Sequence, residues 1–266
     1  MTGMETEAIE RAKGAGTDPV FWTAPPGALP AGAALVMTTR VGGVSRGPYA
    51  ELNVGLRVGD REESVLENVR RIRGALGMDA REPVRVRQVH GTDLAEAAAG
   101  DLLPRADGIL LTAGDPWAAV SVADCAAVAL VAEDGARGAL VHSGWRGTLD
   151  GIAVRAALAL ERSGSPPESL HVVIGPCIHA CCYPVGPETA GRFPAFLIQP
   201  HASGGFALDL PGAIAASLTG AGVPPSRIAI ASECTACLPE RFYSHRRDRG
   251  TTGRHWMLLR LAPPAR

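Results

Sequence analysis

Short apolar runs dominate the middle of the chain, and most of them have the length of a β-strand. The pattern predicts strands at residues 33–39, 107–112, 118–123, 126–132, 138–143, 170–176, 227–232 and 255–261. Residues 83–91 alternate instead, which places Val84, Val86, Gln88 and His90 on one side of a further predicted strand. The other runs are so apolar that we expect their strands to be covered on both faces.

Helical periodicity is clearest at residues 64–78, where Val65, Val69, Ile72 and Leu76 form one apolar stripe among charged residues. Gly77 stands where this helix should end. Residues 148–164 and 211–222 predict two more helices. Strands therefore alternate with helices along much of the chain.

The chain of 266 residues has the length of one large α/β domain. The segment TAPPGALPAG is rich in Pro and Gly and lacks periodicity, so we predict a flexible N-terminal arm at residues 1–30. Residues 31–262 are predicted to form a single α/β domain, with a mixed β-sheet layered with helices. Residues 263–266 are a predicted tail.

Composition argues against several classes of partner. The net charge of −1 and the pI near 6.7 give no general attraction to nucleic acid or to an anionic membrane. No run approaches the roughly 20 apolar residues that span a bilayer, and the first residues carry acids rather than a signal-peptide core. We expect a cytoplasmic protein with no nucleic acid or membrane partner, while the oligomeric state stays open.

Three potential metal ligands lie at the ends of apolar segments. His90 ends VRVRQVH, Cys125 lies in VADCAAV, and His142 ends GALVH. Two imidazoles and one thiolate suit Zn²⁺ and leave a fourth position free, which is typical of catalytic sites. Each residue taken alone is equally compatible with a core cysteine or a hydrogen-bonded histidine, and the spacing is no tight motif.

Arginine next to glycine is a second theme. Arg40 precedes VGGVS, Arg146 lies in GWRG, and SHRRDRGTTGR places four arginines in one loop. A guanidinium and neighbouring backbone N–H groups can bind one anion together, as phosphate binding requires. Arg40 and Arg146 are the favoured candidates because they follow apolar strands, whereas Arg249 is interpreted as solvated.

The remaining cysteines lie in two segments, Cys177, Cys181 and Cys182 in GPCIHACCYPVG, and Cys234 and Cys237 in CTAC. A C-x-x-C pair can bind zinc or cycle between redox states. Because no second C-x-x-C follows at zinc-finger spacing, the sequence favours a structural, reduced role over a metal cluster. Disulfides are not expected in a core of this size.

The motifs together resemble the laccase-domain family, also called the multicopper polyphenol oxidase or peptidoglycan-editing-factor family. The resemblance runs in order through TTRVGGVSRGPYAELNVGLRVGD, QVHG, ADGILLT, VADC, VHSGWRGT, IGPCIHACCYPVG and SHRRDRGTTGR. It implies a laccase-domain-like fold, and zinc ligands at His90, Cys125 and His142. It also implies phosphorolysis of adenosine, inosine and methylthioadenosine, and deamination of adenosine.

The chain departs from the family pattern at a few positions. Ser143 replaces the alanine of H-A-GWRG, His179, Ala180 and Pro184 change GPCIGPCCYEVG, and His245 replaces the tyrosine of SYRRD. None of them is one of the three metal positions. Substrate preference is therefore more in question than the basic chemistry.

The leading hypothesis is a zinc-dependent purine nucleoside enzyme in which His90, Cys125 and His142 form the catalytic metal site. Arg40 and Arg146 would hold the phosphate, so nucleoside and phosphate are the expected small-molecule partners. Asp124 could orient a histidine or a substrate amine. Asn53 could hydrogen-bond the ribose or base, although a turn-capping asparagine fits its position as well.

Three alternatives stay open. Two histidines and a cysteine also suit copper, but a multicopper oxidase needs more than the seven histidines of this chain, including His-x-His pairs, of which there are none. A peptidoglycan-precursor hydrolase would use Cys125 and a histidine as a nucleophile and its base. A structural metal site in a binding module is disfavoured because such sites are usually closed.

Overall fold

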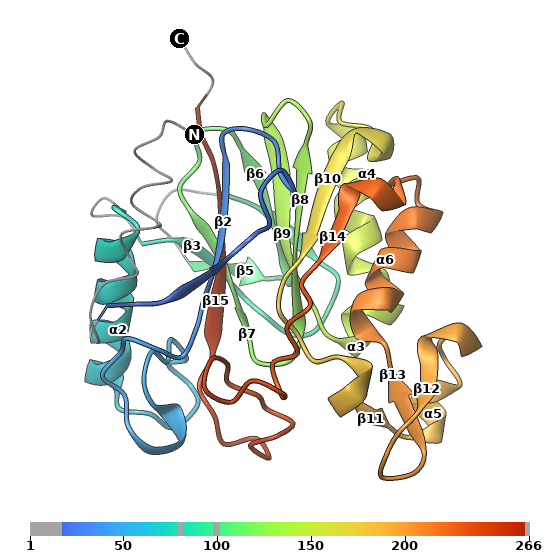
Figure 1. Ribbon diagram of the computed structural model, residues 1–266. Helices are drawn as coiled ribbons and strands as arrows, with labels where there is room; N and C mark the ends of the chain where they lie inside the picture. Colours follow the sequence, from blue (N-terminus) through green and yellow to red (C-terminus); the bar gives the residue numbers. More distant parts are fainter. Residues whose placement is uncertain (1–17, 79–81, 98–101, 264–266) are drawn as a thin grey trace.

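The computed structural model describes residues 18–78, 82–97 and 102–263. Two six-stranded sheets form most of the molecule, and a third sheet of three strands lies beside them (Figure 1). The prediction of a single mixed α/β domain is confirmed, but its strands are divided among these sheets.

The first sheet has the order β1-β2-β15-β7-β3-β5. Its strands are β1 (Phe21–Thr23), β2 (Ala33–Thr38), β3 (Val84–Arg87), β5 (Leu102–Arg105), β7 (Ala118–Val122) and β15 (His255–Leu261). The pairs from β1 to β7 are antiparallel, and β3 pairs in parallel with both β7 and β5. The last strand of the chain thus lies between strands from its first half.

The second sheet has the order β14-β10-β8-β9-β6-β4. Its strands are β4 (Leu94–Glu96), β6 (Gly108–Thr112), β8 (Ala126–Ala132), β9 (Arg137–Ser143), β10 (Leu170–Ile174) and β14 (Ile228–Ile230). The central pairs are antiparallel, and the edge strands β14 and β4 pair in parallel. The third sheet joins β11 (Pro184–Val185), β13 (Phe206–Leu208) and β12 (Ile198–Pro200).

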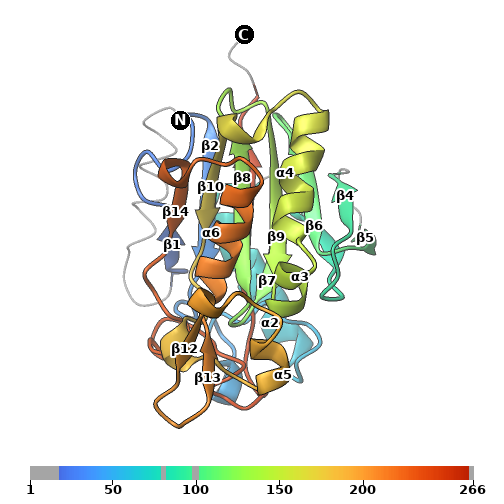
Figure 2. The ribbon, with the colours of Figure 1, turned by 90° about the vertical axis from the view of Figure 1, so that its right-hand side faces the viewer.

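Helices cover the outer faces of the two large sheets. Helix α2 (Glu62–Ala75) lies against the first sheet, and α3 (Trp145–Leu149), α4 (Ile152–Arg162) and α6 (Leu210–Gly220) lie on the side of the second (Figures 1 and 2). The small sheet lies at one end of α6, next to α5 (Pro187–Ala190) (Figure 2). The result is four layers, with helices outside and sheets inside.

Each interface between layers has its own apolar core. Met37, Leu140 and Met257 belong to the core between the two sheets, and Ile152 and Leu170 to the core beneath α4 and α6. All seven residues of β8 are buried, because one face of the strand meets the other sheet and the opposite face meets the helices. The prediction that the apolar strands are covered on both faces is confirmed for β8.

Helix α2 matches its prediction closely. Val65, Val69 and Ile72 are buried, Glu62 and Glu63 lie in the first turn near the positive end of the helix dipole, and Gly77 follows the helix with φ of 57°. The predicted helix at residues 148–164 is divided instead. Gly151, with φ of 80°, separates α3 from α4.

The predicted arm at residues 1–30 needs a correction. Residues 21–23 form β1, which pairs with β2, and Trp22 is buried in the core between the sheets. The ordered domain therefore begins before residue 31, because one short strand precedes the Pro/Gly-rich segment. Residues 1–17, and residues 264–266 of the predicted tail, lie outside the described residues.

Within the described ranges, no helix combines the length and hydropathy that crossing a lipid bilayer would require.

Shortening a side chain between the sheets should destabilise the whole fold. Leu140 is fully buried, so Leu140→Ala is expected to lower the free energy of unfolding by about 2–5 kcal/mol. Leu66 lies on α2 with 51% of its surface exposed, and Leu66→Ala should change it by less than about 0.5 kcal/mol. Urea denaturation followed by circular dichroism measures both. Equal losses would contradict the proposed core.

Candidate metal centre

The three predicted ligands meet where the chain passes from one large sheet to the other. β7 ends at Val122 in the first sheet, and β8 begins at Ala126 in the second, so Cys125 lies in the crossing. His142 lies on β9, where it pairs with Ala127 of β8. His90 follows β3. Donor atoms of His90, Cys125 and His142 all lie within 4.8 Å of one another.

His90 reaches this point by a turn and not on a strand. β3 ends at Arg87, so the predicted alternation through His90 is wrong, and His90 has a left-handed backbone with φ of 60°. The carboxylate of Asp107 accepts the backbone N–H groups of Val89, His90 and Gly91 at 3.0, 2.9 and 2.8 Å. These bonds stabilise the unusual backbone conformation.

Asp107 also orients His142. Its Oδ1 lies 2.8 Å from Nδ1 of His142, and its backbone oxygen accepts the His142 N–H at 2.7 Å. With Nδ1 bound to the carboxylate, Nε2 is the nitrogen left to bind a metal. Asp107 is fully buried immediately before β6. Sequence reasoning missed it, although an aspartate opening an apolar strand in ADGILLT was a usable signal.

The charges of the site favour a thiolate. Burial raises the pKa of Cys125, but the charge and hydrogen bonds of His142 and His90 outweigh it and lower the pKa to about 6. Burial lowers the pKa of His142, yet Cys125 and Asp107 raise it to about 9. For Asp107, burial is likewise outweighed by His142 and by backbone N–H groups, which lower its pKa.

This donor set fits a zinc ion. One thiolate and two imidazoles are typical ligands of Zn²⁺, and three protein ligands leave a coordination position for another group. Gly144 contributes space, because a Cβ there would lie 2.9 Å from Sγ of Cys125 and 3.6 Å from Cδ2 of His90. The glycine of GWRG thus keeps the site open.

Asp124 lies beside Cys125 but does not orient a histidine. Its carboxylate accepts the hydroxyl of Thr235 at 2.7 Å and the backbone N–H of Arg246 at 2.6 Å. The residue has φ of 84°, so it is a second non-glycine residue with a left-handed backbone at this site. Asp107, and not Asp124, orients a histidine, while Asp124 attaches the loop of residues 231–254 to the candidate metal centre.

Arg40 and Asn53 already have protein partners. Arg40 donates from Nε to the oxygen of Ala50 and from Nη1 to the oxygen of Pro239, both at 2.7 Å. Asn53 is fully buried, donates to Asp60 at 2.8 Å, and accepts the backbone N–H of Arg254 at 2.8 Å. Both side chains brace loops, so the structure favours the turn-capping interpretation of Asn53.

Two other arginines are candidates for binding an anion. Arg146 is exposed, immediately after the Gly144–Trp145 turn, and its guanidinium lies 4.7 Å from the centre of the Trp145 ring. Arg254 is half-buried, and burial lowers its pKa although the charges of Cys125 and Asp124 raise it. Arg254 was part of a recognised loop motif, but sequence reasoning did not single it out.

One departure from the family pattern finds an explanation in contacts. Ser143 Oγ lies 2.8 Å from the hydroxyl of Thr148, which links β9 to α3. Pro184 contributes its backbone oxygen to Nη1 of Arg246 at 2.6 Å, a contact that any residue at this position could make. Nothing in the structure explains Ala180 or Pro184.

Known proteins resemble this chain over most of its length. Residues 34–262 match the family model described as multi-copper polyphenol oxidoreductase laccase. A protein of Geobacillus stearothermophilus named purine nucleoside phosphorylase YlmD is 38% identical over 242 residues, covering 84% of this chain and 88% of that protein. A purine nucleoside phosphorylase of Deinococcus radiodurans is 39% identical over 234 residues, covering 84% and 87%.

Solved structures share the fold. The crystal structure of YlmD from Geobacillus stearothermophilus has a TM-score of 0.85 and 35% identity, covering 91% of this chain and 96% of that one. The crystal structure of YfiH from Bacillus licheniformis has a TM-score of 0.81 and 31% identity, covering 86% and 92%. The predicted laccase-domain-like fold is therefore confirmed.

The role of Asp107 can be tested by removing its charge alone. Asp107→Asn keeps the shape but weakens the bond to His142, so we expect zinc affinity to fall by about 10–100-fold. Asp93→Asn, at an exposed position between β3 and β4, should leave the affinity unchanged. Titration against a competing chelator measures both, with circular dichroism to verify folding. Unchanged affinity in folded Asp107→Asn would contradict the assignment.

Proposed function

This chain belongs to the multi-copper polyphenol oxidoreductase laccase family, and on that premise we propose that it is a zinc-dependent purine nucleoside phosphorylase. The observation that carries the proposal is the convergence of His90, Cys125 and His142 at one point between the sheets. The relatives named purine nucleoside phosphorylases supply the reaction class. Adenosine, inosine and methylthioadenosine are the proposed nucleosides.

A zinc ion held by His90, Cys125 and His142 would supply a Lewis acid beside the substrate. The residues of the chain prepare the ligands for it. Asp107 holds the proton of His142 on Nδ1, and the two histidines keep Cys125 in its thiolate form. The site is thus arranged before a substrate arrives, which lowers the reorganisation that catalysis requires.

Phosphorolysis joins a phosphate oxygen to C1′ of the ribose and breaks the bond from C1′ to the purine nitrogen. The bonding electron pair leaves with the purine, which takes up a proton from solvent. The attacking anion needs positive charge, and Arg146 and Arg254 are the cations that we assign to it. Arg40 is not assigned this role because two backbone oxygens already hold its guanidinium.

Adenosine deamination is a second candidate activity of the same site. Histidine and cysteine ligands with a free coordination position are also the ligand pattern of zinc-dependent deaminases. The two reactions differ in their co-substrate, because deamination consumes water and phosphorolysis consumes phosphate. They can therefore be separated in one assay.

Two further activities find less support. Among the residues that the structure describes, the histidines of a possible metal site are His90 and His142, too few for the trinuclear copper cluster of a laccase. Copper could still occupy these ligands in place of zinc. A peptidoglycan hydrolase would use Cys125 as a nucleophile with His142 as its base. In that case alkylation of Cys125, and not metal removal, would control activity.

Product analysis tests the proposed reaction. Zinc-loaded protein is incubated with adenosine, inosine or methylthioadenosine, with and without phosphate, and the products are separated by chromatography. We expect the free base and ribose 1-phosphate, or its methylthio derivative, only when phosphate is present. Inosine formed from adenosine without phosphate would show deamination. If the zinc-loaded protein forms neither product, the proposal is wrong.

Removal of one ligand should abolish metal binding and activity together. We expect His90→Ala to lose zinc and to lower kcat/KM by more than about 100-fold. Loss of a metal ligand should weaken zinc binding more than loss of a residue that only orients a ligand. His201→Ala is the control, because His201 contacts Ser203 in the turn between β12 and β13. Zinc content and steady-state kinetics measure both variants. Full activity of zinc-free His90→Ala would refute a metal mechanism.

The assignment of Arg146 predicts a selective change in phosphate affinity. Arg146→Gln should raise KM for phosphate about tenfold, with little effect on KM for the nucleoside. This effect is small for the loss of a charge-assisted hydrogen bond, because Arg146 is exposed to solvent. Arg137→Gln, at the far end of β9 from His142, should change neither constant. An unaltered phosphate KM in Arg146→Gln would leave Arg254 as the assigned phosphate ligand.

A further inference from the structure

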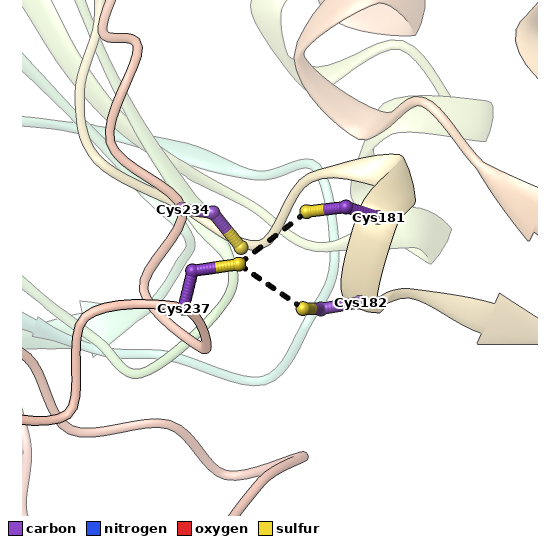
Figure 3. Close-up of side chains that lie close together, drawn as sticks. All are labelled: Cys181, Cys182, Cys234 and Cys237. Atoms are coloured by element: carbon purple, nitrogen blue, oxygen red, sulfur yellow. Dashed lines mark hydrogen bonds between the residues drawn. The ribbon is translucent and has the colours of Figure 1, made fainter. Parts of the chain in front are cut away.

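A second group of potential ligands lies outside the site described above. Cys181 and Cys182 lie on the short 3₁₀ helix η3 (Ala180–Cys182), and Cys234 and Cys237 lie on the loop that follows β14. Their four sulfurs lie within 4.8 Å of one another, and all four side chains point into the same space (Figure 3). Sγ of Cys237 is 3.6 Å from that of Cys181 and 3.3 Å from that of Cys182.

The backbone brings these two segments together. Cys177 and Cys234 form an isolated parallel bridge, and the N–H of Thr235 donates to the oxygen of Cys177 at 2.9 Å. The backbone N–H of His179 lies 3.5 Å from Sγ of Cys234 as a donor. Amide donors that face a sulfur favour its thiolate form, which is the form that binds metals.

We propose that Cys181, Cys182, Cys234 and Cys237 bind one Zn²⁺ ion. A zinc ion binds thiolates at about 2.3 Å in a tetrahedron, which places neighbouring sulfurs about 3.8 Å apart. The two distances above and the limit of 4.8 Å for the group match that spacing. Four protein ligands close the coordination shell, so the ion would be structural rather than catalytic.

Other uses of these cysteines fit the geometry less well. A disulfide requires two sulfurs about 2.05 Å apart, but Cys237 lies between two candidate partners, and a single bridge would leave two thiols crowded beside it. A cluster of several irons holds bridging sulfides between its ligands, and therefore needs a wider arrangement than one ion does. The spacing thus favours a mononuclear centre.

This site explains a feature that the sequence left open. The C-x-x-C pair of Cys234 and Cys237 does have a partner pair, but the partners are adjacent residues 52 positions or more upstream, so they match no zinc-finger spacing. The sequence favoured structural, reduced cysteines over a metal site. Under the proposal that prediction fits Cys177 alone, which is fully buried in the core beneath α4 and α6.

The proposed ion would also brace the wall of the first site. Tyr183 follows Cys182, and its ring lies 5.0 Å from the guanidinium carbon of Arg246. Thr235 follows Cys234 and donates to Asp124, next to Cys125. Loss of the ion should therefore loosen residues 231–254 and raise KM for the nucleoside more than it lowers kcat.

Metal analysis of matched variants tests the proposal independently of the proposed function. We expect about two zinc ions per wild-type chain, and about one in each of two variants, His90→Ala and the double variant Cys182→Ser with Cys237→Ser. Cys177→Ala is the control and should keep both ions. Addition of a mercurial reagent to His90→Ala should release one further zinc ion, detected with a zinc-binding dye.

The outcomes are distinct. If wild-type protein and the double cysteine variant both hold one zinc ion, or if His90→Ala holds none, the proposal is overturned while the first site stands. A colour from bound iron, or a disulfide found by mass spectrometry in protein prepared under reducing conditions, would overturn it as well. If the protein has no phosphorylase activity but still holds the thiolate-bound zinc, only the proposed function fails.

Discussion

The hydrogen bonding of the buried Asp107 carboxylate is the interaction on which the candidate metal centre depends. It accepts three consecutive backbone N–H groups around His90 and also binds Nδ1 of His142, so one side chain positions two of the three predicted ligands. A buried carboxylate without partners would cost several kcal/mol, whereas each hydrogen bond to a charge contributes about 1.5–3 kcal/mol. The same bonds stabilise the left-handed backbone of His90.

The position of the site follows from the arrangement of the sheets. Cys125 lies in the short connection between the two sheets, and His142 lies on a central strand of the second sheet. His90 lies in the turn that follows β3 of the first sheet. Each ligand is therefore attached to a strand whose own place is set by an apolar core. A displacement of one sheet against the other would separate the ligands, so the packing between the sheets and the geometry of the site are coupled.

Local sequence patterns predicted most of the strands and helices. They did not predict how the strands divide into two sheets, which depends on pairing between distant parts of the chain. The apolar runs from residue 107 to residue 143 are strands β6 to β9. The division into two sheets is set by pairs such as β2 with β15, whose residues are more than 200 positions apart. Local periodicity does not encode such pairs. Three-residue strands such as β1 and β4 are also too short to show a periodic pattern.

The sequence predicted three residues that the structure brings together, but it did not predict the residue that positions two of them. Cysteine and histidine at strand ends are a visible signal, and the three are brought together. Asp107 and Asp124 are both aspartates beside a strand, and only the tertiary structure shows that the first contacts His142 and the second a distant loop. The four clustered cysteines illustrate the same limit, because the C-x-x-C pair has no second pair at zinc-finger spacing along the chain.

The arginine motifs show why a shared pattern does not by itself identify ligand contacts. The loops at residues 40–55 and 241–254 bind to each other, through Asn53 to the backbone of Arg254 and through Tyr243 Oη to the oxygen of Tyr49. Burial and nearby arginines lower the pKa of His255 to about 3, so its neutral ring accepts the N–H of Tyr243. These residues therefore hold the two loops together. In the proposed function the anion binds instead to Arg146 and Arg254.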